Sequence, residues 1–317
     1  MLLDIIVPHY NEPLEVVAPF FNILDSQKGV NFDDFRVTMV HNGKVTFGND
    51  DLSCKNLNLV ETMLWKPGVS RARNWGIDHA EAEWVCFCDC DDCYSSIFSL
   101  MMIFHVLKGE NADKFDVIWG SFWMHEENKL SKAESYNPVF IHNKYYRRSF
   151  LNEHNIRFNE DIYMSEDSAF NTLVRLEMDP HRLGQINSLE PLYSWCRRLG
   201  SITMDRSRWM KNTEGHFERN LYVLDLYRQH LRADSDFMVV RTVTDVYAMI
   251  NKYGMLGDKE PMLSRIREFY RENKVLYDRV PKEKLAEALK ASDRDVCVNA
   301  MDISHRPTYE EWLKTIE

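Results

Sequence analysis

The sequence lacks any run of apolar residues long enough to cross a membrane, which takes roughly 18 residues. Its first apolar run, Leu2–Val7, contains an acid and has no basic residue before it. That pattern is not typical of a secretory signal peptide, which begins with a positive region. We therefore expect a cytoplasmic protein without a membrane span.

Basic charge is scarce, because 39 Lys and Arg stand against 49 Asp and Glu and leave a net charge of −10. A protein built mainly to hold nucleic-acid phosphates has the opposite balance. The seven cysteines are odd in number, and Cys86, Cys88, Cys90 and Cys93 have no second cluster to pair with. We expect reduced thiols, and a zinc or iron–sulfur site is the less favoured alternative.

The chain contains short apolar segments of two kinds, one with the period of a strand and one with the period of a helix. Before Pro138, the periodicity predicts strands that alternate with helices, and from Trp209 onward it predicts helices only. We therefore expect an α/β domain over residues 1–204, with a mostly parallel sheet flanked by helices, and a helical region over residues 205–317. The segments that carry this expectation are strands at Leu2–Val7 (ended by Pro8), Phe35–Val40, Leu57–Val60, Trp84–Cys88, Val117–Met124 and Leu189–Trp195, and helices from Pro13 and at Val69–Ala80, Ile97–Leu107, Lys144–His154 and Ser168–Met178.

The sharpest local feature is a turn with three carboxylates directly after the predicted strand Trp84–Cys88. Asp89, Asp91 and Asp92 should lie beyond the carboxyl end of that strand, where open parallel sheets bind their ligands. Their mutual repulsion requires compensation, and oxygen ligands suit a hard divalent cation such as Mg²⁺ or Mn²⁺. The alternative is an acidic turn that caps the following helix.

Three weaker features accompany this turn. Arg71 and Arg73, near the start of a predicted helix, suit phosphate oxygens, although a solvated helix face is the more frequent case. Tyr10 follows the first strand and offers a ring to a base. Glu166 and Asp167 precede an apolar helix, where acids usually act as capping residues.

Taken in order along the chain, these features resemble glycosyltransferase family 2, whose members have the GT-A fold. The resemblance covers roughly residues 2–204 and is strong because all its pieces occur in the right order. The segments that carry it are Ile6–Glu12, Pro67–Asn74, Asp89–Asp92, Asn143–Leu151, Asn155–Phe158, Glu166–Asp167 and Leu192–Thr203.

The resemblance implies an inverting transferase that moves a sugar from a nucleotide-diphosphate donor, preferably a UDP-sugar, to a hydroxyl of a saccharide or cell-surface glycan precursor. Asp167 would be the catalytic base with Glu166 beside it, and Asp91 and Asp89 would bind Mn²⁺ or Mg²⁺. The donor contacts that it implies are Pro8, Tyr10, Glu12, Asn42, Arg71, Arg73, Asp89, Lys144, Arg197 and Arg198.

Two departures from the family pattern concern the donor. Many relatives carry paired acids where this chain has His41-Asn42, and Arg197-Arg198 stand one position later than the arginine of many relatives. None of the histidines His41, His79 and His142 has metal-ligand spacing.

Two other functions stay open. One is transfer to a hydroxylated base in DNA, for which a basic patch would contact phosphates. The other is a nucleotide-sugar-binding protein without catalysis. The residues of the basic patch would be Arg197, Arg198, Arg206, Arg208 and Lys211.

Overall fold

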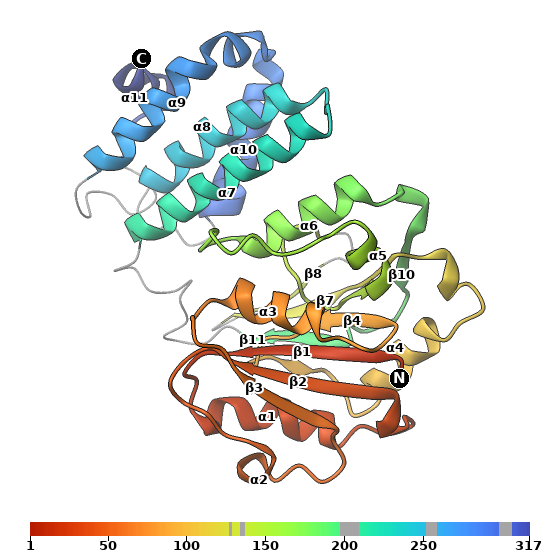
Figure 1. Ribbon diagram of the computed structural model, residues 1–317. Coiled ribbons are helices and arrows are strands. Elements are labelled where there is room, and N and C mark those ends of the chain that lie inside the picture. The colour runs from red at the N-terminus through yellow and green to blue at the C-terminus, as the bar shows by residue number, and fades with distance from the viewer. Residues whose placement is uncertain (127–128, 134–136, 197–208, 252–258, 298–305) are drawn as a thin grey trace. The chain divides into compact units, whose positions relative to one another are not determined.

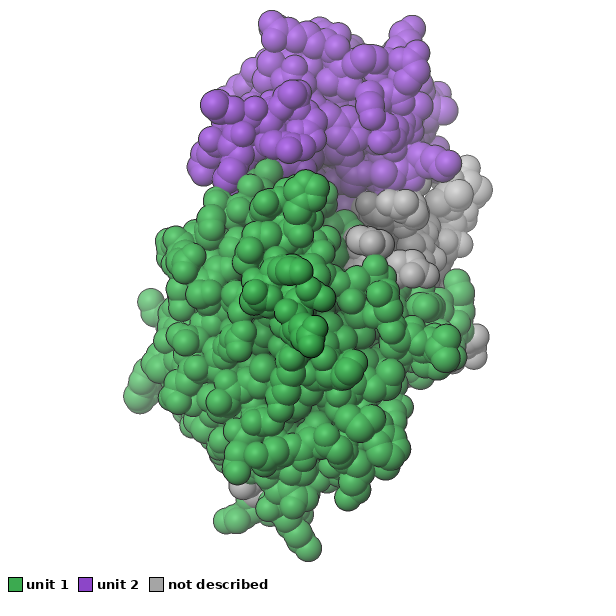
Figure 2. Space-filling view, turned by 90° about the vertical axis from the view of Figure 1, so that its right-hand side faces the viewer, with its two compact units in different colours: residues 1–161, 166–201 green, residues 162–165, 202–317 purple. Residues whose placement is uncertain are grey.

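The computed structural model describes residues 1–126, 129–133, 137–196, 209–251, 259–297 and 306–317. The chain divides into two compact units (Figure 2): residues 1–161 and 166–201 form unit 1, and residues 162–165 and 202–317 form unit 2. Each unit has a hydrophobic core of its own. Among the described residues, none of the helices combines the length and apolar character that a bilayer crossing requires.

Unit 1 is built on a seven-stranded sheet in the order β10-β6-β9-β4-β1-β2-β3, of which β4, β1, β2 and β3 are seen side by side in Figure 1. Strand β9 runs antiparallel to both of its neighbours, and the other pairs are parallel. This confirms the predicted α/β fold with a mostly parallel sheet. The strands are β1 (Leu3–His9), β2 (Phe35–His41), β3 (Leu59–Met63), β4 (Trp84–Phe87), β6 (Val117–Gly120), β9 (Lys144–Arg147) and β10 (Leu183–Ile186).

Helices cover both faces of this sheet, because successive side chains of a strand point to opposite faces. In β1, Ile5 and Val7 belong to the core on one face and Ile6 to the core on the other. The first face is covered by α1 (Leu14–Asp25) and α4 (Ser99–Leu107), and the second by α3 (Val69–Asp78), α5 (Arg148–Glu153) and α6 (Glu166–Glu177). Short elements complete the unit: α2 (Asn49–Leu52) and 3₁₀ turns at Phe32–Asp34, Ala112–Lys114 and Pro180–Arg182.

The cysteines after the fourth strand are part of the first core. Cys86 and Cys88 are 2% exposed and pack among the apolar side chains of that face. Burial raises the pKa of the Cys86 thiol well above its usual value, so the thiol is uncharged. No disulfide is formed by Cys54, Cys86, Cys88, Cys90, Cys93 or Cys196.

A second, four-stranded sheet has the order β5-β11-β7-β8. The prediction of one strand over Val117–Met124 is wrong, because the chain leaves the first sheet after β6 and enters the second as β7. The prediction of a helix over Lys144–His154 is wrong in its first half, where β9 pairs with β4 and β6 before α5 begins. The strands of the second sheet are β5 (Cys93–Tyr94), β7 (Phe122–Glu126), β8 (Lys129–Ala133) and β11 (Tyr193–Cys196).

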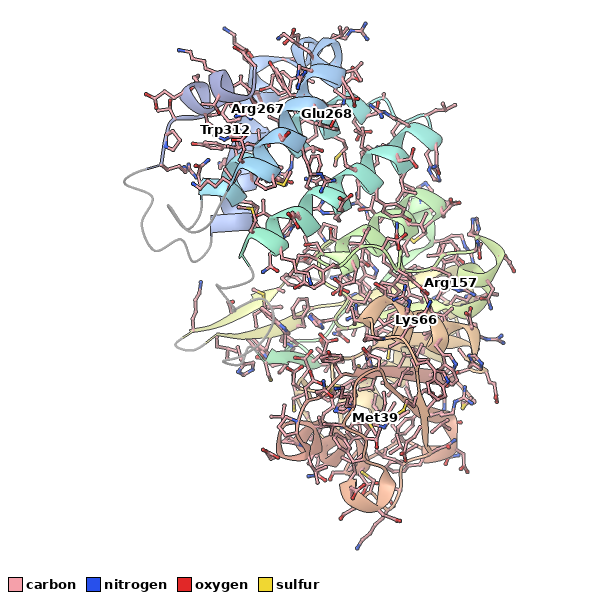
Figure 3. All side chains as sticks on the ribbon, turned by 60° about the vertical axis from the view of Figure 1, so that its left-hand side comes forward. Met39, Lys66, Arg157, Arg267, Glu268 and Trp312 are labelled. Atoms are coloured by element: carbon pink, nitrogen blue, oxygen red, sulfur yellow. The ribbon has the colours of Figure 1, made fainter. Side chains whose placement is uncertain are left out.

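Unit 2 is helical, as predicted for the C-terminal region. Its helices are α7 (Trp209–Gln229), α8 (Ser235–Asn251), α9 (Glu260–Arg279), α10 (Lys282–Cys297) and α11 (Tyr309–Ile316). Trp312 of α11 is buried in this core, and Arg267 of α9, labelled with it in Figure 3, donates a hydrogen bond of 3.0 Å to the Thr315 carbonyl. The short segment 162–165 joins the unit through side chains such as Tyr163, whose hydroxyl donates to Asn212 at 3.4 Å.

Candidate active site

The acidic turn lies directly after β4, at the carboxyl edge of the first sheet. The backbone N–H of Asp92 closes the turn by donating to the Asp89 carbonyl at 3.2 Å. The three carboxylates face different surroundings, because the Asp89 side chain is 33% exposed, Asp91 is half-buried and Asp92 is buried. The turn therefore presents Asp89 and Asp91 outward and keeps Asp92 inside the protein.

A buried guanidinium joins this turn to the start of α6. Arg73 of α3 is 2% exposed and donates from Nη1 to Asp167 at 2.6 Å and to Glu166 at 3.0 Å. Its Nη2 donates to Asp89 at 3.0 Å. Burial acts to lower the pKa of Arg73, but the carboxylates outweigh it and raise that pKa, so the guanidinium is charged. One cation thus holds Asp89 together with Glu166 and Asp167, which come much later in the sequence.

Asp167 occupies the first turn of α6, preceded by a strained backbone position. Ser165 has a φ of 61°, in the left-handed region that non-glycine residues rarely adopt and that is often found near functional sites. Burial raises the pKa of Asp167 to about 6; Arg73 opposes this rise, and Glu166 and Asp89 add to it. A carboxylate with a pKa close to neutrality can both accept and release a proton, as a general base must.

Behind the acidic turn, Asp92 connects it to β11. Its carboxylate accepts hydrogen bonds from the Tyr193 hydroxyl at 2.7 Å and from the backbone N–H of Cys196 at 2.8 Å. The buried His142 places its Nδ1 3.4 Å from Asp92 Oδ2, but this nitrogen makes no hydrogen bond. Burial raises the pKa of Asp92 and lowers that of His142, so both changes favour the uncharged forms.

Asp89, Asp92 and His142 form a group that can hold a cation. One ligand atom from each lies within 4.8 Å of the others. The carboxylate oxygens suit a hard cation such as Mn²⁺, and the Nδ1 of His142 has no competing hydrogen bond. His142 was not predicted as a ligand, because it comes from the segment before β9 and not from the neighbourhood of the acids. Asp91, which the sequence predicts as a ligand, is not part of this group.

The loop after β1 is ordered by its own acid. The Glu12 carboxylate accepts the backbone N–H groups of Tyr10 at 2.9 Å and Asn11 at 3.2 Å. Burial acts to raise the pKa of Glu12, but these hydrogen bonds and the nearby His9 outweigh it and lower that pKa. Tyr10 is 50% exposed and available to a ligand, whereas Pro8 is buried within β1, which continues to His9 beyond the predicted end of the strand.

Asn42 ties three loops of this edge together. Its amide nitrogen donates to the His9 carbonyl at 3.0 Å, and its oxygen accepts the backbone N–H of Gly68 at 3.1 Å. The next residue must be glycine, because a Cβ at Gly43 would lie 1.3 Å from the Tyr10 carbonyl oxygen. The loops after β1 and β2 and the start of α3 are therefore fixed relative to one another.

The other predicted donor contacts lie in varied surroundings. Arg71 is half-buried and pairs with Glu160 at 2.9 Å. Lys144 is 1% exposed; its ammonium donates to the carbonyls of Asn137 and Phe140, and burial lowers its pKa to about 7.

Most residues of the predicted basic patch lie outside the described part of the chain, namely Arg197, Arg198, Arg206 and Arg208. The ammonium of Lys211, which is described, lies 4.5 Å from the ring centre of Tyr163.

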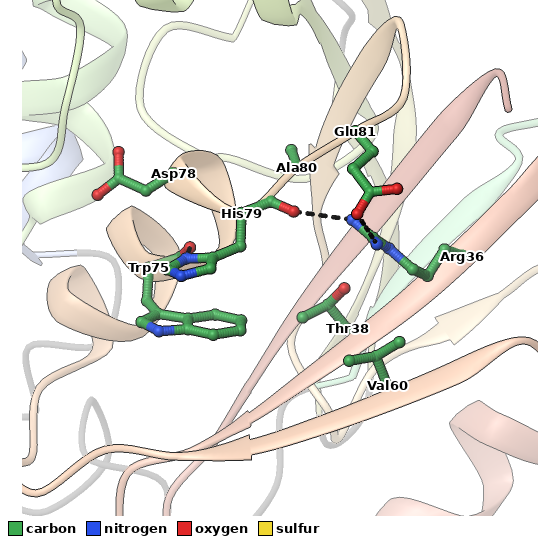
Figure 4. A pocket seen from close by; sticks show the side chains of 8 residues that line it. All are labelled: Arg36, Thr38, Val60, Trp75, Asp78, His79, Ala80 and Glu81. Atoms are coloured by element: carbon green, nitrogen blue, oxygen red, sulfur yellow. Dashed lines mark hydrogen bonds and ion pairs between the residues drawn. The ribbon is translucent and has the colours of Figure 1, made fainter.

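A separate pocket of about 430 Å³ lies beside the C-terminal end of α3 (Figure 4). Two of its lining residues, Arg36 and Glu81, lie near the beginnings of β2 and β4. The pocket is therefore at the edge of the sheet opposite to Asp89. Arg36 is already paired there with Asp4 at 2.7 Å and Glu81 at 3.1 Å. The pocket thus contains none of the residues predicted to act in catalysis.

Known proteins are similar to this chain in sequence and in fold. A family model described as glycosyl transferase family 2 matches residues 4–179. A Bacillus subtilis (strain 168) protein, the uncharacterized glycosyltransferase EpsJ, is 25% identical over 64% of this chain and 63% of its own length. The minor teichoic acid biosynthesis protein GgaB of the same organism is 24% identical over 72% of this chain and 27% of its own. The chain therefore spans less than two thirds of either curated relative.

Solved structures show the same fold. The crystal structure of S. aureus TarS 1-349 in complex with UDP-GlcNAc is similar with a TM-score of 0.64 and 18% identity, over 94% of this chain and 89% of that one. The mannosyltransferase PcManGT from Pyrobaculum calidifontis, in complex with GDP-Man and Mn²⁺, is similar with a TM-score of 0.51 and 13% identity, over 92% and 87% of the two chains.

The mostly parallel sheet with acids at its carboxyl edge is that of a GT-A glycosyltransferase. Because the family model covers more than half of the sequence, the chain belongs to glycosyl transferase family 2.

Proposed function

We propose that this glycosyltransferase moves a sugar from a nucleoside-diphosphate donor, preferably a UDP-sugar, to a hydroxyl group in a single inverting displacement. The observation that carries the proposal is the network in which Arg73 joins Asp167 to Asp89. It places a carboxylate with a pKa of about 6 next to the turn that would hold the donor diphosphate.

In this proposal Asp167 removes the proton of the acceptor hydroxyl as its oxygen attacks the anomeric carbon. The carboxylate is held at 2.6 Å from Arg73, which fixes its orientation. Glu166 is held by the same guanidinium at 3.0 Å and raises the pKa of Asp167 toward neutrality. A positioned base of this kind typically contributes about 10²–10⁴-fold to a rate.

The cation would be Mn²⁺ or Mg²⁺. When bound, it would offset the negative charge of the departing diphosphate. Asp89 and Asp91 are the ligands that the family resemblance implies, and the group of Asp89, Asp92 and His142 supports a site at the same turn. The complex of PcManGT with GDP-Man and Mn²⁺ supports manganese as the cation.

The donor would lie along the carboxyl edge of β1 and β2. Tyr10 would meet the base, Pro8 and Glu12 would shape the pocket, and Asn42 would act through the loops that it holds together. Arg71, Lys144, Arg197 and Arg198 remain proposed donor contacts. The UDP-GlcNAc bound by TarS supports a uridine donor, and the name of GgaB supports a cell-surface glycan precursor as acceptor, for which residues 205–317 would supply the binding surface.

A donor screen tests the proposal directly. UDP- and GDP-sugars are incubated with the full chain, with and without Mn²⁺, and release of the nucleoside diphosphate is measured. We expect turnover of a UDP-sugar that depends on the cation. If no nucleotide sugar binds or turns over, the proposal is wrong. Retained donor binding by Asp167→Asn, with loss of transfer, separates the base from the donor site.

A further inference from the structure

Two buried histidines join the ends of β1 and β2 beneath the loop that carries Tyr10. His9 and His41 are opposite each other in the register of these parallel strands and are 0% and 3% exposed. Their Nδ1 atoms lie 2.8 Å apart. The ring of Phe47 packs against both, with centroid distances of 4.6 Å to His9 and 5.9 Å to His41. The pair is therefore shielded from water.

The hydrogen-bond partners of the two rings connect β2 to the loop after β1. His9 Nε2 is 2.9 Å from the Glu12 carbonyl oxygen, which can only accept, so Nε2 carries a proton. A further proton lies between the two Nδ1 atoms and joins the rings by a hydrogen bond. Burial lowers the pKa of His41 to about 4, and His9 adds to this shift, so His41 is neutral at pH 7.

Hydrogen bonds thus connect His41 to His9, and His9 donates to the backbone carbonyl of Glu12. Glu12 in turn holds the N–H groups of Tyr10 and Asn11 on its carboxylate. Two apolar side chains would fill the same space without burying polar atoms that need partners, so packing alone does not explain the two histidines. A loop fixed in this way is preorganised, so less conformational freedom is lost when a ligand binds to it.

We propose that His41 is a positioning residue for the nucleotide donor, acting through His9 on the loop Tyr10–Glu12. This inference rests on the proposed function, which places the donor at that loop. His41 touches neither the donor nor the reacting atoms, and its effect reaches them through a chain of two hydrogen bonds.

The first test compares two substitutions at His41 in the full chain. His41→Leu removes the hydrogen bond between the two rings and leaves Nδ1 of His9 without this partner. His41→Asn is the matched control, because the Asn amide reaches the place of Nδ1 of histidine and can hydrogen-bond to His9 through its nitrogen or its oxygen. Dissociation constants for UDP and for GDP, each with Mn²⁺, are measured by titration calorimetry.

We expect His41→Leu to bind the nucleoside diphosphate about tenfold more weakly, because the loop that is no longer held must then be ordered on binding. His41→Asn should bind within about twofold of the wild type, since its amide replaces the lost hydrogen bond. In both variants kcat at saturating donor should stay near the wild-type value. Unchanged binding by His41→Leu overturns the proposal. So does tenfold weaker binding by folded His41→Asn, which keeps the test decisive if the Leu variant does not fold.

A double-mutant cycle separates positioning from packing. In His9→Gln the amide nitrogen stands near the place of Nε2 and donates to the Glu12 carbonyl without help from residue 41. We therefore expect His41→Leu to weaken binding in the wild-type background but not in the His9→Gln background. An equal loss in both backgrounds means that His41 acts by filling space, and the inference is then wrong.

The wild-type titration distinguishes the two proposals. If the wild type binds neither UDP nor GDP, the proposed function is wrong and this inference is wrong with it. If the wild type binds and the variants do not follow the expected order, only the inference about His41 is overturned.

Discussion

The elevated pKa of Asp167 makes the pH dependence of transfer a direct test of the base. With a pKa of about 6, half of the Asp167 carboxyls are ionised at that pH. About nine tenths are ionised one pH unit above and about one tenth one unit below. We therefore expect kcat at saturating donor to fall about tenfold from pH 7 to pH 5, with a single ionisation on the acid side.

The substitution Asp167→Asn keeps the size of the side chain and removes the base. We expect kcat to fall by about 10²–10⁴-fold, equivalent to roughly 3–5 kcal/mol of activation free energy, and the acid limb to disappear. Donor affinity should persist. The rate is measured from pH 5 to pH 8 as release of nucleoside diphosphate that depends on the acceptor.

Glu166→Gln is the matched control at the neighbouring position. Because Glu166 raises the pKa of Asp167, its removal should shift the acid limb to lower pH without abolishing transfer. An Asp167→Asn enzyme that keeps the limb, or a Glu166→Gln enzyme that loses transfer, would refute the assignment of the base.

The same pKa predicts a stability effect. The pKa of Asp167 rises from 3.8 to about 6 on folding, so the folded chain binds this proton more tightly than the unfolded chain. The resulting stability is fully present below pH 3.8 and is lost as the pH rises through about 6. The loss amounts to about 3 kcal/mol. Urea unfolding measures this effect. As the pH is raised from 4 to 7, the free energy of unfolding of Asp167→Asn should rise by about this much relative to that of the wild type.

Three further changes test the frame around this base. Arg73→Met should destabilise the fold by about 3–5 kcal/mol in urea unfolding, because it leaves buried acids uncompensated, and should move the acid limb of Asp167 to higher pH. Gly43→Ala should weaken UDP binding in a calorimetric titration, since its Cβ would collide with the Tyr10 carbonyl. Chelation of Mn²⁺ should stop transfer reversibly, and Asp91→Asn should raise the Mn²⁺ concentration needed for half the maximal rate; transfer that is indifferent to chelation contradicts the metal proposal.

The features that could be predicted from the sequence depend on neighbours along the chain. Ile5, Ile6 and Val7 show a strand buried on both faces, and Asp89 directly after β4 shows where the carboxyl edge lies. These patterns are local and strong, so the parallel sheet and the position of the acidic turn followed from them. The order of the motifs along the chain predicted glycosyltransferase family 2, and the family model confirms it.

The features that could not be predicted depend on pairing over long distances. The segment from Lys144 looks helical by itself, but its first residues form β9 between β4 and β6, where pairing on both sides and the aromatic residues Tyr145 and Tyr146 favour a strand. Arg73 was expected at the donor phosphates, and only the fold shows that it meets Asp167 at 2.6 Å. His142 was dismissed on spacing for the same reason.

The four residues before α6 limit how the helical unit can be recombined between related genes. Residues 162–165 belong to unit 2, although the chain on both sides of them belongs to unit 1. Tyr163 bonds Asn212, and Ser165 lies 3.1 Å from the ring nitrogen of His216. A recombination that replaced only the helices after residue 201 would change the residues that Tyr163 and Ser165 contact, directly before Glu166. The helical unit is therefore inherited intact only when two separate stretches of the gene are exchanged together.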